Sequence, residues 1–298
     1  MSWQAKSVEG LLRVVGAKRN GRNPEVVARN IAKARAKAKD PAPRERQRRD
    51  LDVTERAESG MRVFELAPKS GETTHRVVYY HGGSYTFEIA PPHWFFLSYL
   101  ARTTGARVIV PIYPLAPEST ADLTVPIATD LVERVIDEVG SRDVTVMGDS
   151  AGGGLSLAVV QQLNKRGKQP RGTVLISPWL DVSMTDPGLA AVDPHDAMLT
   201  IPGLAECGRL YAGRLDVKDP LASPLFGELD GLAPIDIYTG THDLLNVDAH
   251  NLVKRAAGRD VEIRLHEEPN MPHVHPLLSI IPEGKRARDQ IIDNVRSG

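Results

Sequence analysis

Apolar and polar residues alternate in a regular pattern through most of the chain from residue 51 onward. Short apolar runs predict buried strands, and most are followed by a longer segment whose apolar residues recur with helical spacing. Because strands and helices alternate, the pattern predicts an α/β fold with a mostly parallel sheet covered by helices on both faces. The predicted strands are 51–55, 61–67, 75–83, 106–114, 144–150, 172–180, 234–243 and 261–269, and the predicted helices are 91–105, 124–140, 151–167, 248–258 and 284–296.

Two helices are expected before this alternation begins. An apolar stripe with helical spacing predicts the first, and its members are Val8, Leu11, Leu12 and Val15. Asn23, Pro24 and Glu25 predict the start of the second, because they supply an N-cap, a proline at the first helical position and an acid in the first turn. Residues 40–50 are rich in proline and charge, which is typical of a linker.

The alternation fails a second time at residues 183–217. This stretch contains three prolines and a short segment with helical character, and it predicts an insertion. The expected division is therefore an N-terminal part at 1–50, a core in two pieces at 51–182 and 218–298, and the insertion between them.

Composition indicates an ordinary globular protein. The chain has 298 residues, of which 41% are hydrophobic and 25% charged, and it contains no apolar run long enough to span a membrane. No secretory signal is visible at the N-terminus. Cys207 is the single cysteine, so no intramolecular disulfide can form, and the expected location is cytoplasmic.

Charge is distributed unevenly along the chain. Residues 1–50 hold 14 Lys and Arg against 5 Asp and Glu, a net charge of +9, whereas the remainder carries a net charge of −10. The favoured interpretation is the solvated face of helices packed on an acidic body. A peripheral contact of this basic arm with anionic surfaces is the alternative. Nucleic acid is not expected as a partner, because the arm lacks interleaved aromatic residues that would stack on bases.

The motif Gly148-Asp149-Ser150-Ala151-Gly152 fits the pattern G-x-S-x-G between a predicted strand and a predicted helix. In such an elbow the central serine has a strained backbone, and side chains at the two flanking glycines would clash. The turn exposes the serine hydroxyl at the N-terminus of a helix, which favours developing negative charge. Ser150 is therefore the candidate nucleophile. A glycine-rich turn that binds phosphate or only packs closely is the alternative.

A serine nucleophile needs a base and an acid that orients the base. Asp243 follows the strand at 234–243, and His273 follows the strand at 261–269, which gives the order Ser, Asp, His. Asp248 and His275 are the competing acid and base. A zinc site built on the histidines is not favoured, because no cysteine or acid stands at ligand spacing, and neither a metal nor another cofactor is expected.

Backbone N–H groups after the strand at 75–83 are candidates for an oxyanion hole. The sequence HGGSY places Gly82 and Gly83 there, where their amides and that of Ala151 would bind the oxygen that becomes negatively charged.

Taken together, these motifs resemble the hormone-sensitive lipase family of esterases over about residues 75–280. The segments that carry the resemblance are HGGSY, YPLAPE, GDSAGG, SPWLD, ASPL, GTHDLL and MPHVH. The resemblance implies an alpha/beta-hydrolase fold whose cap consists of residues 1–50 and 183–217. It also implies Ser150, Asp243 and His273 as the catalytic residues.

Some residues depart from the family pattern, and others are assigned supporting roles. Ser84 replaces the usual third glycine of the loop, and His275 stands where a phenylalanine is common. His81 is expected to hold its loop by hydrogen bonds, whereas Asp149 and Glu118 are expected to brace neighbouring loops. The residues expected to line the substrate pocket are Ser84, Tyr85, Trp94 and Phe95.

The expected function is that of a serine carboxylesterase acting on short- to medium-chain acyl esters through an acyl-enzyme. An amide deacetylase or acetylhydrolase would use the same residues, and a non-catalytic ligand-binding protein on this fold is a third reading. The expected partner is a small-molecule ester. In the resembling family pairing through an edge strand is common, which suggests a homodimer.

Overall fold

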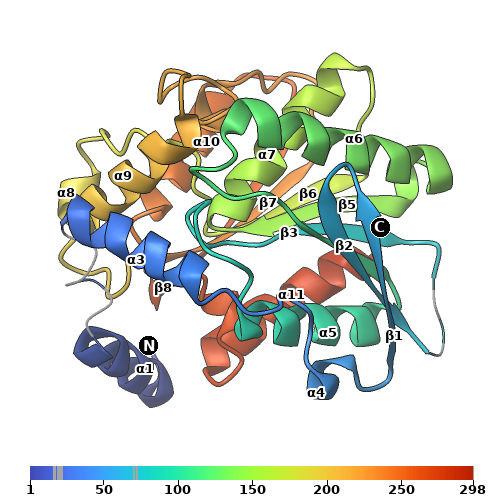
Figure 1. Ribbon diagram of the computed structural model, residues 1–298, viewed down its shortest axis with the longest axis horizontal. Coiled ribbons are helices and arrows are strands. Elements are labelled where there is room, and N and C mark those ends of the chain that lie inside the picture. The colour runs from blue at the N-terminus through green and yellow to red at the C-terminus, as the bar shows by residue number, and fades with distance from the viewer. Residues whose placement is uncertain (16–17, 19–22, 70, 72, 298) are drawn as a thin grey trace.

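The fold is built around one eight-stranded sheet with the strand order β1-β2-β4-β3-β5-β6-β7-β8. A computed structural model describes residues 1–15, 18, 23–69, 71 and 73–297 (Figure 1). β1 and β2 pair antiparallel, β2 and β4 also pair antiparallel, and all the other pairs are parallel. The strands are β1 (Leu51–Glu58), β2 (Met61–Pro68), β3 (Arg76–Tyr80), β4 (Arg107–Ile112), β5 (Val144–Asp149), β6 (Gly172–Ile176), β7 (Ile235–His242) and β8 (Ile263–Pro272).

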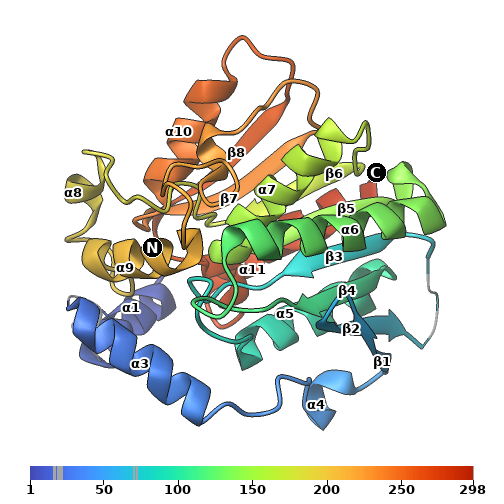
Figure 2. The ribbon, with the colours of Figure 1, turned by 45° about the horizontal axis from the view of Figure 1, so that its top comes forward.

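Helices cover both faces of the sheet, so the predicted layer arrangement is confirmed (Figures 1 and 2). α5 (Pro91–Thr104) and α11 (Pro282–Ser297) lie on one face, where Leu97 and Ile291 are fully buried. α6 (Ala121–Val139), α7 (Ala151–Lys165) and α10 (Asn246–Ala256) lie on the other face. The central strands are apolar on both sides because each side packs against helices.

Local sequence signals set several of these boundaries. Asn23 caps α3 (Pro24–Ala36) by accepting a hydrogen bond from the backbone of Glu25, and Gly105 ends α5 in a left-handed conformation with φ of 77°. The predicted linker at 40–50 contains the short helix α4 (Glu45–Arg48). The described residues also contain short 3₁₀ helices at Ser141–Asp143, Pro224–Phe226 and His275–Leu277.

The N-terminal helices and the insertion lie together at one end of the sheet (Figure 2). The insertion contains α8 (Leu189–Val192) and α9 (Ile201–Ala212), and α3 contacts α9. These are the two places where strand and helix cease to alternate in the sequence.

The apolar stripe expected on the first helix, α1 (Trp3–Val15), is only partly buried. Val8 packs beside Met271 and Ile281, whereas Leu11 is 62% exposed. The reason is that α1 contacts the body near Ala5 and Val8, which leaves Leu11 on the outer side of the helix. The side chain of Val15 lies outside the described residues. Among the helices of the described residues, none is long and apolar enough to cross a bilayer.

Candidate active site

The turn between β5 and α7 holds Ser150 in a strained backbone conformation, with φ of 53° and ψ of −122°. A Cβ atom at Gly148 would lie 2.2 Å from the carbonyl oxygen of Gly152, and one at Gly152 would lie 2.0 Å from that of Tyr80. No side chain fits at either position. The two glycines therefore permit the close approach of α7 to β5 and β3 that the turn requires.

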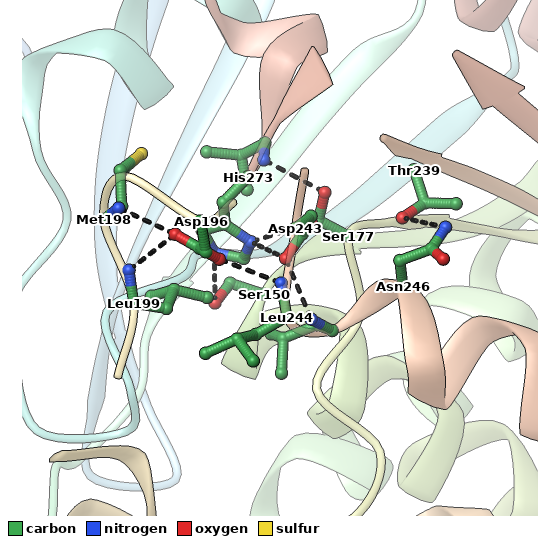
Figure 3. Close-up of polar contacts among 12 residues, drawn as sticks. Ser150, Ser177, Asp196, Met198, Leu199, Thr239, Asp243, Leu244, Asn246 and His273 are labelled. Carbon is green, nitrogen blue, oxygen red and sulfur yellow. Dashed lines mark hydrogen bonds and ion pairs between the residues drawn. The ribbon is translucent and has the colours of Figure 1, made fainter. Parts of the chain in front are cut away.

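His273 lies directly after β8 with its ring against Ser150 (Figure 3). Its Nε2 is 3.0 Å from the Ser150 hydroxyl oxygen, and the imidazole is buried. The next residue, Val274, has a φ of 49°, which is rare for a β-branched residue, and its backbone N–H donates to the hydroxyl of Ser177. This contact with the loop after β6 fixes the backbone on which the His273 ring is carried.

Asp243 lies at the end of β7 and is fully buried. His273 Nδ1 lies 3.0 Å from each of its carboxylate oxygens and donates to them. The backbone N–H of Leu245 donates to the same carboxylate at 2.9 Å. Since Nδ1 carries the donated proton, Nε2 is left to accept the proton of the Ser150 hydroxyl.

Electrostatics favour a protonated ring at His273. Burial by itself would lower the pKa of His273. The charge of Asp243 and its hydrogen bond outweigh burial, with smaller contributions from Asp196 and Asp149, and they raise this pKa above the usual histidine value. The ring is thus a stronger base than an isolated histidine.

The competing acid and base lie elsewhere. His275 is buried without a hydrogen-bond partner for either ring nitrogen among the described residues, and burial lowers its pKa to about 4. Asp248 accepts hydrogen bonds from the backbone of Leu180 and Asp181. The sequence offered two candidate acids and two candidate bases. The structure places His273 against Ser150, and Asp243 against His273.

The loop after β3 corrects one expectation about the oxyanion hole. The backbone N–H of Gly82 donates to Asp149 at 2.8 Å, so this amide is committed to a carboxylate. The amides of Gly83, Ser84 and Ala151 have no hydrogen-bond acceptor within the described part of the chain. Gly83 has a φ of 130°, and a Cβ atom there would lie 2.4 Å from a backbone oxygen. Gly82 supports the loop instead of donating to substrate.

Asp149 is the centre of this supporting network. It is buried and accepts hydrogen bonds from the Tyr79 hydroxyl at 2.6 Å and from His93 Nε2 at 3.2 Å, in addition to Gly82. Burial would raise the pKa of Asp149, but the charge and hydrogen bond of His93 lower it below the usual aspartate value. The ionised carboxylate is therefore stabilised directly behind the Ser150 turn.

His81 holds the loop assigned to it, whereas Glu118 contacts the helix α3. His81 Nδ1 donates to the carbonyl oxygen of Gly82 at 2.7 Å, and the ring stacks on Tyr113. Glu118 is exposed, and its carboxylate lies 3.4 Å from the guanidinium of Arg35 in α3. Arg35 also donates to the carbonyl oxygens of Thr86 and Ala116, so it joins α3 to the loop after β3.

Comparison with known proteins identifies the family to which the chain belongs. A family model described as the alpha/beta hydrolase fold matches residues 77–277. The chain belongs to this family. Two solved structures are similar to this hydrolase over its whole length. They are an esterase from the bacterial hormone-sensitive lipase family, with a TM-score of 0.83 and 26% identity, and a hormone-sensitive lipase from a metagenome library, with a TM-score of 0.85 and 25% identity. Each comparison covers 100% of this chain and 98% of the other, and the predicted resemblance to that family is confirmed.

Curated relatives of this alpha/beta hydrolase include two bacterial proteins. A triacylglycerol lipase of Mycobacterium tuberculosis is 40% identical over 191 residues, which are 62% of this chain and 38% of that protein. An acetyl-hydrolase of Streptomyces hygroscopicus is 33% identical over 71% of this chain and 72% of that protein. The hydrolase thus spans well under half the length of the first relative and most of the second.

A cavity of about 190 Å³ lies between the loop after β3, α3 and the insertion. Its walls are mainly apolar, and the lining residues are Val27, Asn30, Ser84, Phe87, Met198, Leu199, Thr200, Gly203, Leu204 and Cys207. Ser84, one of the residues expected to line the substrate pocket, is among them. Tyr85 is buried beside this region, with its ring stacked on Tyr211.

Trp94 and Phe95 do not line this cavity, and their place in a substrate pocket stays a prediction. Trp94 lines a second cavity, of about 550 Å³, together with residues of α3 and the linker. Trp94 packs edge-on against Phe64 and donates from its indole nitrogen to the carbonyl oxygen of Pro41. Phe95 is 37% exposed beneath the guanidinium of Arg46. Both belong to the packing of α5 against residues 40–50, because the ring positions at the start of α5 face the linker.

Sequence reasoning missed Asp196 in the insertion, which lies beside Asp243 and His273 in Figure 3. Its position in a segment without regular alternation gave no signal of burial. The described residues contain no group of three or more histidine, cysteine or acidic side chains suited to hold a metal ion.

Proposed function

We propose that this hydrolase is a serine carboxylesterase in which Ser150 is the nucleophile, His273 the general base and Asp243 the acid that orients the base. The observation that carries the proposal is the hydrogen-bonded row formed by these three side chains. Nε2 of His273 lies 3.0 Å from Ser150 Oγ, and Nδ1 lies 3.0 Å from Asp243. Relatives named triacylglycerol lipase and acetyl-hydrolase support the same class of reaction.

In the first half of the reaction Ser150 Oγ attacks the ester carbonyl carbon while His273 Nε2 takes the hydroxyl proton. The carbonyl oxygen gains negative charge, and the amides of Gly83, Ser84 and Ala151 are the donors that stabilise it. His273 then gives its proton to the alcohol as the bond to the carbonyl carbon breaks. Asp243 stabilises the imidazolium throughout this step.

In the second half a water molecule replaces the alcohol. His273 removes a proton from the water as the oxygen attacks the acyl-enzyme, and the proton returns to Ser150 Oγ when the acid leaves. An amide is cleaved by the same sequence of steps, so a deacetylase remains the second candidate for this site. The acetyl-hydrolase among the relatives favours keeping this candidate.

The cavity beside Ser84 supports short to medium acyl esters as substrates. The cavity has a volume of about 190 Å³ and mainly apolar walls, which suits a short to medium acyl chain.

Residues 1–50 and 183–217 are proposed to form a cap over this cavity. Val27 in α3 and Leu204 in α9 both line it, which supports a shared role of the two segments. A homodimer, a cytoplasmic location and a contact of the basic arm with anionic surfaces stay predictions of the sequence.

The test is hydrolysis of a series of p-nitrophenyl esters of increasing acyl length by the wild type and by Ser150→Ala. We expect the wild type to favour short chains and the variant to lose activity to near the uncatalysed rate. Activity that is equal in the two proteins would contradict the proposal. A folded wild type that binds the esters without hydrolysing them would favour the ligand-binding alternative.

A further inference from the structure

The carboxylate of Asp196 joins the insertion to the loop that carries the catalytic acid. Asp196 is fully buried. One carboxylate oxygen accepts hydrogen bonds from the backbone N–H groups of Met198 and Leu199 at 2.7 and 2.8 Å. The other accepts from the backbone N–H of Leu244 at 2.8 Å. Because Leu244 directly follows Asp243, this side chain fixes the position of the catalytic acid from the cap side.

The same carboxylate lies beside the row of catalytic side chains (Figure 3). Burial, and then the negative charge of Asp243, raise the pKa of Asp196, whereas His273 lowers it. In the reverse direction, Asp196 is one of the groups that raise the pKa of His273. All three hydrogen-bond partners of Asp196 are donors, which suits an ionised carboxylate.

Asp196 also fixes the position of one wall of the substrate cavity. Met198, Leu199 and Thr200 line the cavity, and the turn held by Asp196 begins this segment. One side chain therefore positions both the cavity wall and the catalytic acid. Such a link lets the cap influence the catalytic geometry without contacting the substrate.

The far side of the Asp196 turn is held by the N-terminal arm. The ammonium group of Lys18 donates to the carbonyl oxygens of Asp193 and Asp196, and it lies 3.2 Å from the Asp193 carboxylate. Arg13 donates to the carbonyl oxygen of His195. Arg13 of α1 and Lys18 thus bind the backbone of the turn on one side, and the Asp196 carboxylate faces the catalytic residues on the other.

We propose that Asp196 is a positioning residue for ester hydrolysis, which holds the Asp243 loop and the cavity wall in place and stabilises the imidazolium of His273 by its negative charge. The inference rests on the proposed function, because it assumes that His273 is the base. It goes beyond that function by assigning a role in catalysis to a residue of the cap.

Three carboxylates from different elements raise the pKa of His273. Asp243 directly follows β7, Asp149 is the last residue of β5 and Asp196 lies in the insertion. The neutral ring of His275 lies two residues further along the chain, and burial keeps its pKa at about 4. Removing the charge of Asp196 therefore leaves two carboxylates to stabilise the imidazolium.

The experiment measures kcat, KM and the pH dependence of kcat/KM for p-nitrophenyl butyrate, with the full chain of the wild type and of Asp196→Asn. We expect Asn to move the acid limb to lower pH by roughly one pH unit, because a nearby negative charge favours the protonated ring. We expect kcat to fall about tenfold while KM changes less, as is common when a group that supports a catalytic residue is removed. Asp196→Glu keeps the charge and should keep the acid limb of the wild type.

The matched control is Asp186→Asn in the same insertion. Asp186 also accepts a hydrogen bond from a backbone N–H two residues ahead, that of Gly188, and it contacts Asn251, which is remote from His273. We expect the control to leave kcat and the acid limb unchanged. If the acid limb shifted in both Asp196→Asn and Asp186→Asn, the proposal would be overturned, because the shift would then not depend on which carboxylate had lost its charge.

An acid limb at the wild-type pH in folded Asp196→Asn would also overturn the proposal, even if the variant had lost thermal stability. If the Asn variant does not fold, Asp196→Ser decides by the same criterion, since its hydroxyl still accepts from the turn but carries no charge. A failure of the proposed function looks different. In that case the wild type itself hydrolyses no ester, or Ser150→Ala is as active as the wild type.

Discussion

The hydroxyl oxygen of Ser150 lies 3.0 Å from Nε2 of His273, although 123 positions separate the two residues in the chain. Ser150 follows β5 and His273 follows β8, and two further strands lie between them in the sheet. Parallel strands end at the same edge, so the loop after β8 reaches back toward the turn after β5. The contact of Ser177 with Val274 fixes the loop in that position.

We expect Asp243→Asn to lower kcat about 10⁴-fold. An asparagine cannot fix the ring tautomer of His273 or stabilise the imidazolium, and this loss is the usual one when the orienting acid of such a row is replaced. Asp248→Asn is the control, because burial raises the pKa of Asp248 to about 8 and its carboxylate only accepts from two backbone amides. Steady-state kinetics would contradict the assignment if the control lost as much kcat as Asp243→Asn.

Activity should decline with falling pH from a value above the usual histidine pKa. The charge of Asp243 raises the pKa of His273 against the opposing effect of burial, and only the neutral ring can accept the Ser150 proton. Below that pKa, kcat/KM should fall tenfold for each further pH unit. A pH profile whose acid limb lies well below the ordinary histidine value of about 6.5 would disagree with this prediction.

Folding stability should decrease in acid because three histidines, His75, His81 and His275, are buried with a lowered pKa. Burial lowers the pKa of His81 and of His275 to about 4 in the folded state, below the unfolded value of about 6.5. The unfolded chain then binds more protons between these values, so the free energy of unfolding falls as pH drops through this window. Each group contributes about 3 kcal/mol of this loss once pH is below 4.

Urea unfolding at a series of pH values measures this dependence, and His275→Phe should reduce its slope between about pH 6.5 and about pH 4. An unchanged slope in that variant would show that His275 is not buried neutral.

Gly152→Ala should abolish the turn geometry. The added Cβ atom would lie 2.0 Å from the carbonyl oxygen of Tyr80, so α7 must move away from β3. Overpacking of this kind costs about 1–3 kcal/mol or more, and the displaced Ser150 loses activity as well. Gly10→Ala is the control, since nothing lies within 4 Å of its added Cβ and alanine favours the helix α1. Thermal unfolding and ester hydrolysis are measured for both variants. Gly152→Ala should lower the unfolding temperature and the activity. Gly10→Ala should leave the activity unchanged and either keep or slightly raise the unfolding temperature.

Leu204→Ala should shift the acyl-length preference toward longer esters. Leu204 is buried in α9 and lines the cavity of about 190 Å³, so its truncation lengthens the available space. Leu210→Ala changes the same helix outside the cavity and should retain the wild-type preference. The ratio of kcat/KM for hexanoate and acetate esters measures the shift, and an identical ratio in both variants would refute the assignment of the cavity.

The apolar pattern was sufficient to predict nearly every strand and helix, because strands buried on both faces are short continuous apolar runs and amphipathic helices have apolar residues at helical spacing. The positions of Ser150, Asp243 and His273 were predictable for a related reason. Each stands at the end of a predicted parallel strand, where the residues of one sheet edge meet.

Other features depend on contacts that no local pattern encodes. The amide of Gly82 donates to Asp149, which is 67 positions away, so the proposed oxyanion donors are Gly83, Ser84 and Ala151. Asp196 meets Leu244 across 48 positions from within an irregular segment. An aromatic residue such as Trp94 is typical of a substrate pocket, but its indole nitrogen donates a hydrogen bond to the carbonyl oxygen of Pro41 in the linker.

The most direct test of the account is to treat the wild type with a fluorophosphonate, which labels activated serines, and to locate the adduct by mass spectrometry of its peptides. We expect one adduct on Ser150, formed rapidly in the wild type and lost or greatly slowed in His273→Ala. Full esterase activity after treatment without an adduct on Ser150, or labelling of Ser150 that is as fast in His273→Ala, would contradict it.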